Sequence, residues 1–303
     1  MGEDSQYKGE LWTQQAIALL NLLSWEKIGD SGMDVEGTDN VEYGIDCLYS
    51  IKNPAKDIPE SLIIEAKCYL TTSLSQSALQ AWVDRLNLKI STLRGSKELF
   101  DRHPIFQEIS DLKIGIIFIW FSNTDEYKSF RPRFREMVEN ITVSTKPLKS
   151  SIFNKIYIID NDLISKLCSI HSVIKDFNEF KFYYPSSFIN NRAVQRTSIL
   201  SLDYIFSKFI LGQSKDNSGA ELNIVFYFGE LNTQSFRLLK SVLLSFLFID
   251  ESRKLIIYKY HRDEEFRKIE PDIIKLYKED NIDFEIKDMD SCRELPAFIT
   301  NIK

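Results

Sequence analysis

The chain has 303 residues, of which 44% are hydrophobic and 27% are charged, and its formal net charge is −6. This composition supports two ordinary domains with a sizeable core and excludes an intrinsically disordered chain. The acidic balance argues against a general nucleic-acid binder with a basic surface. The sequence contains neither a secretory leader nor an apolar run of the ~18 residues that span a bilayer. We therefore expect a cytoplasmic protein with no membrane partner.

The four cysteines and three histidines carry no sign of a soft-metal site. The cysteines are scattered and form no Cys-x-x-Cys pair, and the histidines lack the spacing of zinc ligands. Cysteine inside an apolar element usually behaves as a small hydrophobic residue. A reducing compartment and the absence of zinc are the resulting expectations.

The N-terminal elements alternate between helix and strand. An apolar face with helical spacing predicts a helix over residues 9–23. Strands are predicted over 43–51 and 61–69, and the loop 52–60 between them contains two prolines. Four acidic residues at positions 34, 36, 39 and 42 are interpreted as a solvated loop before the first strand.

Polar residues interrupt these two strands in an informative pattern. Asp46 lies in a Gly-Ile-Asp sequence, and Glu65-Ala66-Lys67 lies inside the apolar second strand. Because successive strand residues face opposite sides, Glu65 and Lys67 share one face and Ala66 points to the other. A carboxylate and an ammonium in such an apolar strand are costly to bury without a function. The simpler alternative is two solvated strand ends with a weak ion pair.

The pattern suits hydrolysis of a phosphodiester with a divalent metal. Asp46 and Glu65, with the Ala66 carbonyl, offer the oxygen ligands that Mg²⁺ prefers, and Mn²⁺ is also possible. Lys67 could then orient or deprotonate the attacking water and neutralise charge on the phosphate. We therefore predict a metal site at Asp46, Glu65 and Ala66.

The elements that follow complete one α/β domain. A helix is predicted over 75–93, and an almost wholly apolar strand over 114–121 is typical of a sheet covered on both faces. A further helix is predicted over 127–140 and a strand over 155–160. These elements place a mixed sheet flanked by helices in residues 1–160.

With these motifs, residues 8–160 resemble the PD-(D/E)xK nuclease superfamily, and most closely its Mrr-like restriction endonuclease branch. The resemblance assigns the metal-binding aspartate to Asp46 and the Glu-x-Lys motif to Glu65 and Lys67. The nominal proline of the motif is Ile45 here, a departure from the pattern.

The resemblance also implies supporting residues and a biological role. The acid of the first helix would be Glu10, and the glutamine on the helix after the motif would be Gln76, with Gln80 as the alternative. It implies a Mg²⁺-dependent endodeoxyribonuclease in restriction or anti-phage defence. DNA as substrate, a homodimer and a second protein encoded alongside are the implied partners.

The charges are unevenly distributed along the first domain. Residues 26–46 carry seven acids against one base, whereas residues 128–155 carry seven bases against two acids. Basic side chains in such a cluster can bind the nucleic-acid backbone. We therefore assign Lys128, Arg131, Arg133 and Arg135 as candidate nucleic-acid contacts, with a solvated helix face as the alternative.

The pattern of residues 161–303 predicts a second α/β domain with a parallel sheet. Helices are predicted over 162–177, 202–211, 233–248 and 263–280, a loop over 212–219, and strands over 180–184, 222–228, 255–260 and 284–286. This half contains no glycine-rich phosphate loop. We interpret it as a recognition or assembly domain of unknown target.

Two other functions remain open. The chain could be a nuclease-fold subunit with an assembly or sensing role in a defence complex, inactive without its partner. A nucleotide-binding regulator centred on the C-terminal sheet is the weaker alternative, because the glycine loop is missing.

Overall fold

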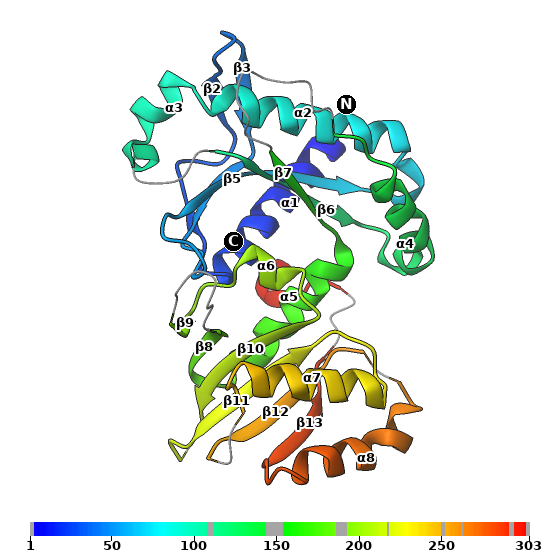
Figure 1. The fold of residues 1–303 in the computed structure, drawn as a ribbon. Helices are drawn as coiled ribbons and strands as arrows, with labels where there is room; N and C mark the ends of the chain where they lie inside the picture. The colour runs from blue at the N-terminus through cyan, green and yellow to red at the C-terminus, as the bar shows by residue number, and fades with distance from the viewer. Residues whose placement is uncertain are drawn as a thin grey trace. The chain divides into compact units, whose positions relative to one another are not determined.

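The computed structural model forms two compact units, one of residues 1–164 with 293–303 and one of residues 165–292 (Figure 1). It describes residues 3–107, 112–143, 154–185, 193–216, 218–249, 252–261, 263–290 and 294–300. Cys292 and the two bases at positions 146 and 149 lie outside the described residues. Among the described residues, no helix combines the length and the apolar character needed to cross a membrane.

The first unit is built on a mixed five-stranded sheet in the order β1-β4-β5-β6-β7. Its strands are β1 (Glu26–Lys27), β4 (Cys47–Ile51), β5 (Glu60–Tyr69), β6 (Ile114–Phe121) and β7 (Lys155–Ile159). β1, β4 and β5 pair antiparallel, and β5, β6 and β7 pair parallel. The predicted mixed sheet is thereby confirmed.

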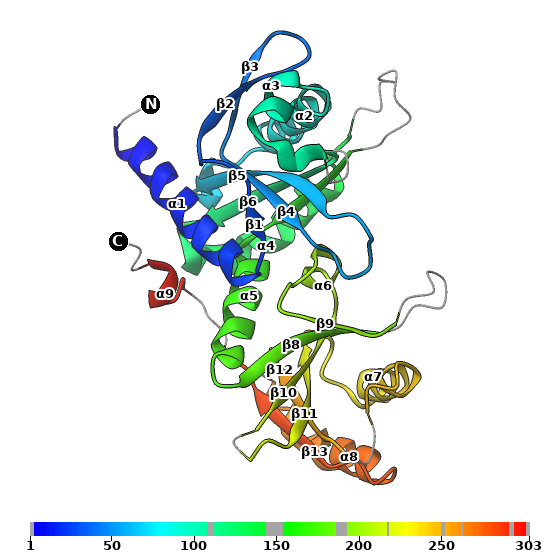
Figure 2. The ribbon, with the colours of Figure 1, turned by 90° about the vertical axis from the view of Figure 1, so that its left-hand side faces the viewer.

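Helices cover both faces of this sheet (Figure 2). One face carries α2 (Gln76–Leu93), α3 (Lys97–Arg102) and α4 (Thr124–Glu139), and the other carries α1 (Glu3–Leu22), against which α9 (Ala297–Thr300) packs. Two short 3₁₀ turns, Thr71–Ser73 and Pro104–Gln107, connect the elements.

The strand register decides which side chains meet which helix. Residues Ile117 and Ile119 of β6, the partners of Glu65 and Lys67, belong to the core cluster formed with α2 and α4. Phe118, the partner of Ala66, lies under the α1 residue Trp12, with ring centroids 5.5 Å apart. Glu65 and Lys67 therefore lie on the α2 face, and Ala66 lies on the α1 face.

The predicted acidic loop is in part a hairpin. β2 (Met33–Glu36) and β3 (Glu42–Ile45) pair antiparallel, and the turn between them contains Asp39, which accepts a hydrogen bond from the Tyr43 hydroxyl. These strands are short and half-exposed, so their sequence lacks the apolar run that indicates a strand.

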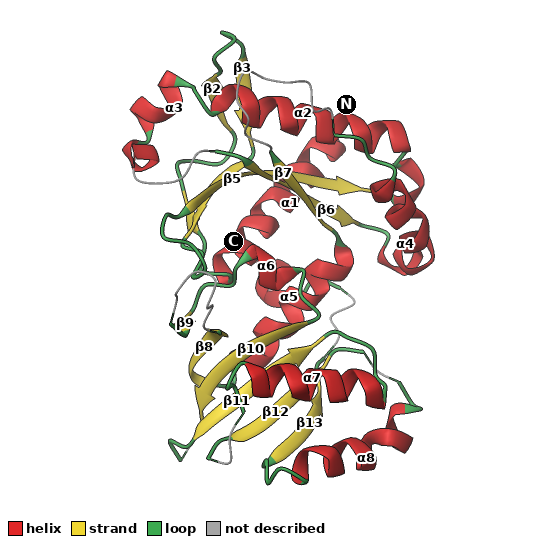
Figure 3. Ribbon diagram, viewed as in Figure 1, coloured by secondary structure: helices red, strands yellow, loops and turns green. Residues whose placement is uncertain are grey.

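The second unit contains a six-stranded sheet in the order β13-β12-β11-β10-β8-β9 (Figure 3). Its strands are β8 (Asn178–Tyr184), β9 (Gln195–Thr197), β10 (Phe209–Lys215), β11 (Glu221–Tyr227), β12 (Lys254–Lys259) and β13 (Phe284–Asp288). β11, β12 and β13 are parallel as expected, whereas β8, β9 and β10 add antiparallel pairs, so the sheet is mixed. The helices are α5 (Asn161–Ile174), α6 (Leu202–Ile205), α7 (Thr233–Ser245) and α8 (Phe266–Lys278), and α5 begins in the first unit.

The predicted helix over 202–211 and loop over 212–219 are wrong. Helix α6 ends at Ile205, and β10 then runs from Phe209 to Lys215 between β8 and β11. A Cβ added at Gly212 would lie 2.3 Å from the Phe180 ring, so the glycine admits that ring across the strand rather than marking a turn. Pairing on both edges overrides the local helical spacing here.

Candidate active site

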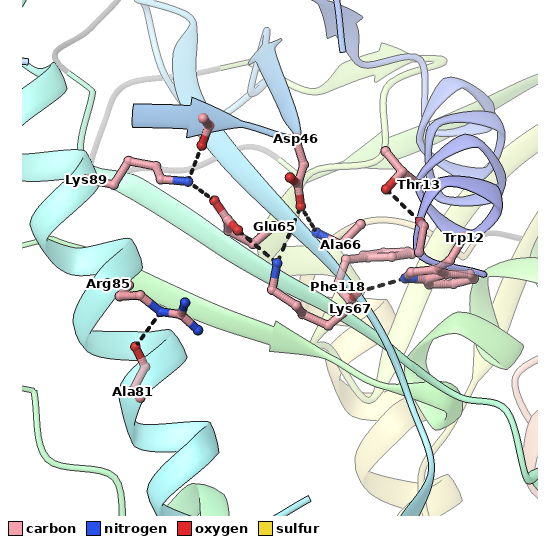
Figure 4. Close-up of polar contacts among 12 residues, drawn as sticks. Trp12, Thr13, Asp46, Glu65, Ala66, Lys67, Ala81, Arg85, Lys89 and Phe118 are labelled. Carbon is pink, nitrogen blue, oxygen red and sulfur yellow. Dashed lines mark hydrogen bonds and ion pairs between the residues drawn. The ribbon is translucent and has the colours of Figure 1, made fainter. Parts of the chain in front are cut away.

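The candidate site lies where β3 passes into β4 beside the middle of β5 (Figure 4). Asp46 occupies the single position between the two strands, and its Oδ2 accepts a hydrogen bond of 2.8 Å from the Ala66 backbone N–H. This bond fixes the carboxylate against β5, beyond the last β4–β5 pair at Cys47 and Ile64. The backbone of β5 therefore positions Asp46.

Lys67 brings the two predicted carboxylates together. Its Nζ lies 2.9 Å from Glu65 Oε2 and 3.5 Å from Asp46 Oδ2. The Glu65 side chain is only 14% exposed and Lys67 24%, whereas Asp46 is 32% exposed. The structure thus unites Asp46, Glu65 and Lys67 in one partly buried cluster.

Burial and charge act in opposite directions on this cluster. Burial disfavours the Glu65 carboxylate, but the charges of Lys67 and Lys89 outweigh it and hold the pKa of Glu65 below its ordinary value. Burial likewise disfavours the Lys67 ammonium, but Glu65 and Asp46 outweigh it and raise the pKa of Lys67. Both residues are therefore charged at neutral pH.

A second lysine reaches the same carboxylate from α2. Lys89 Nζ donates to Glu65 Oε1 and to the Gly44 carbonyl oxygen. Its side chain is 13% exposed, so it is as buried as that of its partner Glu65. Lys89 is not among the predicted site residues. The available signal was the basic pair Arg85 and Lys89, four residues apart on one face of the predicted helix.

A pocket of about 180 Å³ opens beside the cluster on the α2 face. Basic, acidic and apolar side chains line it: Tyr43, Glu65, Lys67, Trp82, Arg85, Leu86, Leu88 and Lys89. The Arg85 Nε is bonded to the Ala81 carbonyl oxygen one turn earlier (Figure 4). Three cationic side chains thus meet a small cavity next to two carboxylates, an arrangement suited to a phosphate group.

The donor set fits a divalent ion held by two carboxylates and a carbonyl. The Ala66 N–H points to Asp46, and in an extended strand the carbonyl of the same residue points to the same side. Within the described parts of the chain, no three Asp, Glu, His or Cys side chains form a metal-holding group. A metal here would therefore depend on Asp46, Glu65 and the Ala66 carbonyl, with water and substrate completing its ligands.

The structure places Glu10 on α1, whereas Asp46, Glu65 and Lys67 lie on or beside β5. Glu10 is an exposed residue of α1, which packs on the opposite face of the sheet from Glu65 and Lys67. The nearby helical residue Trp12 is bound to the sheet by its indole N–H, which donates to the Phe118 carbonyl at 3.1 Å. An acidic residue early in a first helix is a favourable dipole partner in any protein, so its position alone was a weak signal.

The two glutamines are engaged elsewhere. Gln76 Nε2 donates to the Met137 carbonyl of α4 at 3.0 Å, and Gln80 exchanges hydrogen bonds with the Thr142 backbone. Gln76 is also the first residue of α2, thirteen residues before Lys89, which corresponds to roughly 20 Å along a helix axis. These contacts join α2 to the end of α4 and place neither amide at Glu65.

The basic cluster on α4 divides into exposed and paired side chains. Lys128, Arg133 and Arg135 are exposed, whereas Arg131 is half-buried and forms an ion pair with Asp162. The surrounding helix is fixed by Phe134, which packs edge-on against Phe121 of β6. Three of the four predicted nucleic-acid contacts are therefore accessible, and Arg131 serves the packing of its own unit.

Comparison with known protein families identifies the first unit. Residues 1–163 match the family model described as the GAPS4 protein PD-(D/E)XK nuclease domain. No curated protein matches the chain. Because the family match covers more than half of the 303 residues, this chain belongs to the family of the GAPS4 protein PD-(D/E)XK nuclease domain.

Proposed function

We propose that the chain is a metal-dependent endonuclease that hydrolyses DNA phosphodiester bonds. The observation that carries this proposal is the convergence of Asp46, Glu65 and Lys67 beside a pocket lined by further cations. The nuclease-domain family supports the same chemistry. The order of the elements and the spacing of the motif also support our narrower assignment to the Mrr-like branch.

Each residue has a defined role in this proposal. Asp46, Glu65 and the Ala66 carbonyl would hold Mg²⁺, or Mn²⁺ in its place. When bound, the ion supplies Lewis-acid polarisation of the phosphate and lowers the pKa of a ligated water. Lys67 orients or deprotonates the attacking water and neutralises charge that develops on the phosphate.

The exposed bases of α4 provide a second contact to the substrate in this proposal. Lys128, Arg133 and Arg135 would bind the DNA backbone, which carries no sequence information by itself. We further propose a nuclease domain of residues 1–160 and a recognition or assembly domain of residues 161–303. One such site cuts one strand, so a duplex break calls for a homodimer or a second protein encoded alongside.

The proposed setting is anti-phage defence in the cytoplasm. The resemblance to restriction endonucleases implies this role, and a nuclease domain that cuts foreign DNA fits it. A second candidate is a nuclease-fold subunit that stays inactive without its partner. The observation favouring it is that both oxygens of Glu65 are occupied by ammonium groups.

The proposal is tested by cleavage of plasmid and phage DNA by the purified full chain with Mg²⁺ or EDTA. Lys67→Ala should lower cleavage by at least about 100-fold, the lower range for a positioned catalytic group. Lys56→Ala is the matched control, because Lys56 also pairs with a glutamate, Glu60, at the start of β5. Cutting that survives EDTA or Lys67→Ala would disprove the assigned site.

A folded wild-type protein that cuts nothing would favour the second candidate. Repeating the assay with a co-purified partner protein then separates an inactive fold from a subunit that requires assembly. Cleavage that appears only with the partner and disappears in Lys67→Ala would place the chemistry in this chain.

A further inference from the structure

Lys89 makes an unusual contact for a residue on a helix surface. Its ammonium is inserted between the Gly44 carbonyl and Glu65 Oε1, and the side chain is only 13% exposed. Gly44 lies two residues before Asp46 in the same segment. Lys89 thus joins α2 to both segments that carry the carboxylates (Figure 4).

The charges of the four side chains of the cluster balance. Two carboxylates, Asp46 and Glu65, face two ammonium groups, Lys67 and Lys89. Lys89 contacts Glu65 Oε1 and Lys67 contacts Glu65 Oε2 at 2.9 Å, so each oxygen of this carboxylate already has a cation. Adding a divalent ion would leave excess positive charge in a partly buried site, which is costly. One ammonium must therefore leave Glu65 when a metal binds there.

The contacts distinguish the two lysines. Lys67 is shared between Glu65 and Asp46, so an ammonium displaced from one carboxylate still lies beside the other. The second contact of Lys89 is a neutral carbonyl, and its side chain lines the pocket together with Arg85. Lys89 can therefore move from Glu65 into the pocket, where a phosphate would take up its charge.

We propose that Lys89 is an internal cation that competes with a divalent ion for Glu65 Oε1 and leaves this oxygen when the ion binds. Lys89 then sets the metal affinity of the site, and the released ammonium faces the pocket and is a positioning residue for the substrate phosphate. This inference rests on the proposed metal-dependent function.

The test is calorimetric titration of the full chain with Mn²⁺ in the absence of DNA. Lys89→Met keeps the length of the side chain but removes its charge, so we expect it to bind Mn²⁺ more tightly by roughly 5- to 150-fold, the usual range for coupled equilibria. Arg85→Met is the matched control, since Arg85 lines the same pocket one turn earlier and its Nε contacts a backbone carbonyl. It should change the affinity much less, because removing a positive charge that does not touch Glu65 frees no metal ligand.

The outcomes separate this inference from the proposed function. Equal or weaker Mn²⁺ binding by Lys89→Met, or an equal gain in Arg85→Met, overturns the displacement of Lys89. If Asp46→Asn abolishes the wild-type binding, the metal site stands even when the inference fails. No Mn²⁺ binding by either wild type or Lys89→Met overturns both. Lys89→Gln, which retains a donor for Gly44, replaces the methionine variant if that variant does not fold.

Discussion

At the scale of single residues, Glu65 is the carboxylate on which the charge balance of the site depends. Its pKa lies below the ordinary value of 4.5, because Lys67 and Lys89 outweigh the effect of burial. Such a carboxylate stabilises the fold above its ordinary pKa, and this contribution is lost as the pH falls through the folded-state pKa. The stability from Glu65 is therefore present at neutral pH and disappears in acid.

We predict that Glu65→Gln lowers the melting temperature at pH 7, because two partly buried ammonium groups lose their shared counter-ion. The difference from wild type should shrink in acid, as the wild-type carboxylate also becomes protonated. Thermal unfolding followed by circular dichroism at neutral pH and across the acid range measures both differences. Glu139→Gln, at an exposed position of α4, is the control and should give a small difference throughout. If Glu65→Gln lowered the melting temperature as much in acid as at pH 7, this would contradict the pairing of Glu65 with the two ammonium groups.

At the scale of elements, the packing of α2 on β6 places Lys89 at the site. A Cβ added at Gly115 of β6 would lie 2.7 Å from Ile90 Cδ1 and 2.8 Å from Leu86 Cγ. Leu86 and Ile90 flank Lys89 along the helix. Because Gly115 allows α2 to approach β6 closely, it determines how far the Lys89 side chain reaches into the site. Helix packing, rather than local sequence, therefore determines the contact between Lys89 and Glu65.

We predict that Gly115→Ala destabilises the fold by about 1–3 kcal/mol, the usual cost of overpacking a core. The methyl group must shift the Leu86 and Ile90 side chains of α2. If the helix moves with them, Lys89 moves outward and Glu65 should become more accessible to Mn²⁺. Urea denaturation and Mn²⁺ titration measure the two effects. Leu86→Ala combined with Gly115→Ala removes one of the two clashes, so the double variant should lose less stability than the sum of the two single losses. No loss of stability in Gly115→Ala would show that α2 tolerates a wider spacing.

The exposed bases of α4 form a surface whose effect on DNA binding depends on salt. Replacing Lys128, Arg133 and Arg135 together by alanine should weaken DNA binding and flatten its salt dependence, by about 0.9 in logarithmic slope for each phosphate that the variant no longer neutralises. Arg131→Ala should instead lower the melting temperature, because Arg131 pairs with Asp162. Fluorescence anisotropy with a labelled duplex at several salt concentrations measures the first effect. An unchanged slope in the triple variant would remove α4 from the DNA surface.

Local patterns predicted some of these elements and missed others for a physical reason. The strand that carries Glu-x-Lys was predictable, because the alternation of side chains along a strand fixes which residues share a face. The Gly-Ile-Asp sequence indicated the strand that precedes it in the chain. The contact between Lys89 and Glu65 was not predictable, because the spacing of residues in α2 does not show how closely the helix packs at Gly115. The helix predicted over 202–211 failed for a related reason, because pairing of β10 with β8 and β11 is non-local.

At the scale of the whole molecule, the first unit contains both ends of the chain, and the second unit is formed by the residues between them. Residues 293–303 return to the first unit, where α9 packs against α1 and Ile299 is buried at 1% exposure. A division of the chain at residue 160 omits this returning segment. No local pattern reveals it, because α9 spans only four residues and its partner lies at the opposite end of the sequence.

We predict that deleting residues 294–303 destabilises the first unit, since it exposes the α1 surface that α9 covers. Hydrogen exchange followed by mass spectrometry should show faster exchange in α1 and β5, while β11 and α7 of the second unit keep their protection. Phe298→Ala is the matched control, because that side chain is 40% exposed and its loss leaves Ile299 buried against the first unit. Faster exchange confined to the second unit would show that the returning segment stabilises that unit instead, and the packing of α9 on α1 would then contribute little to the fold.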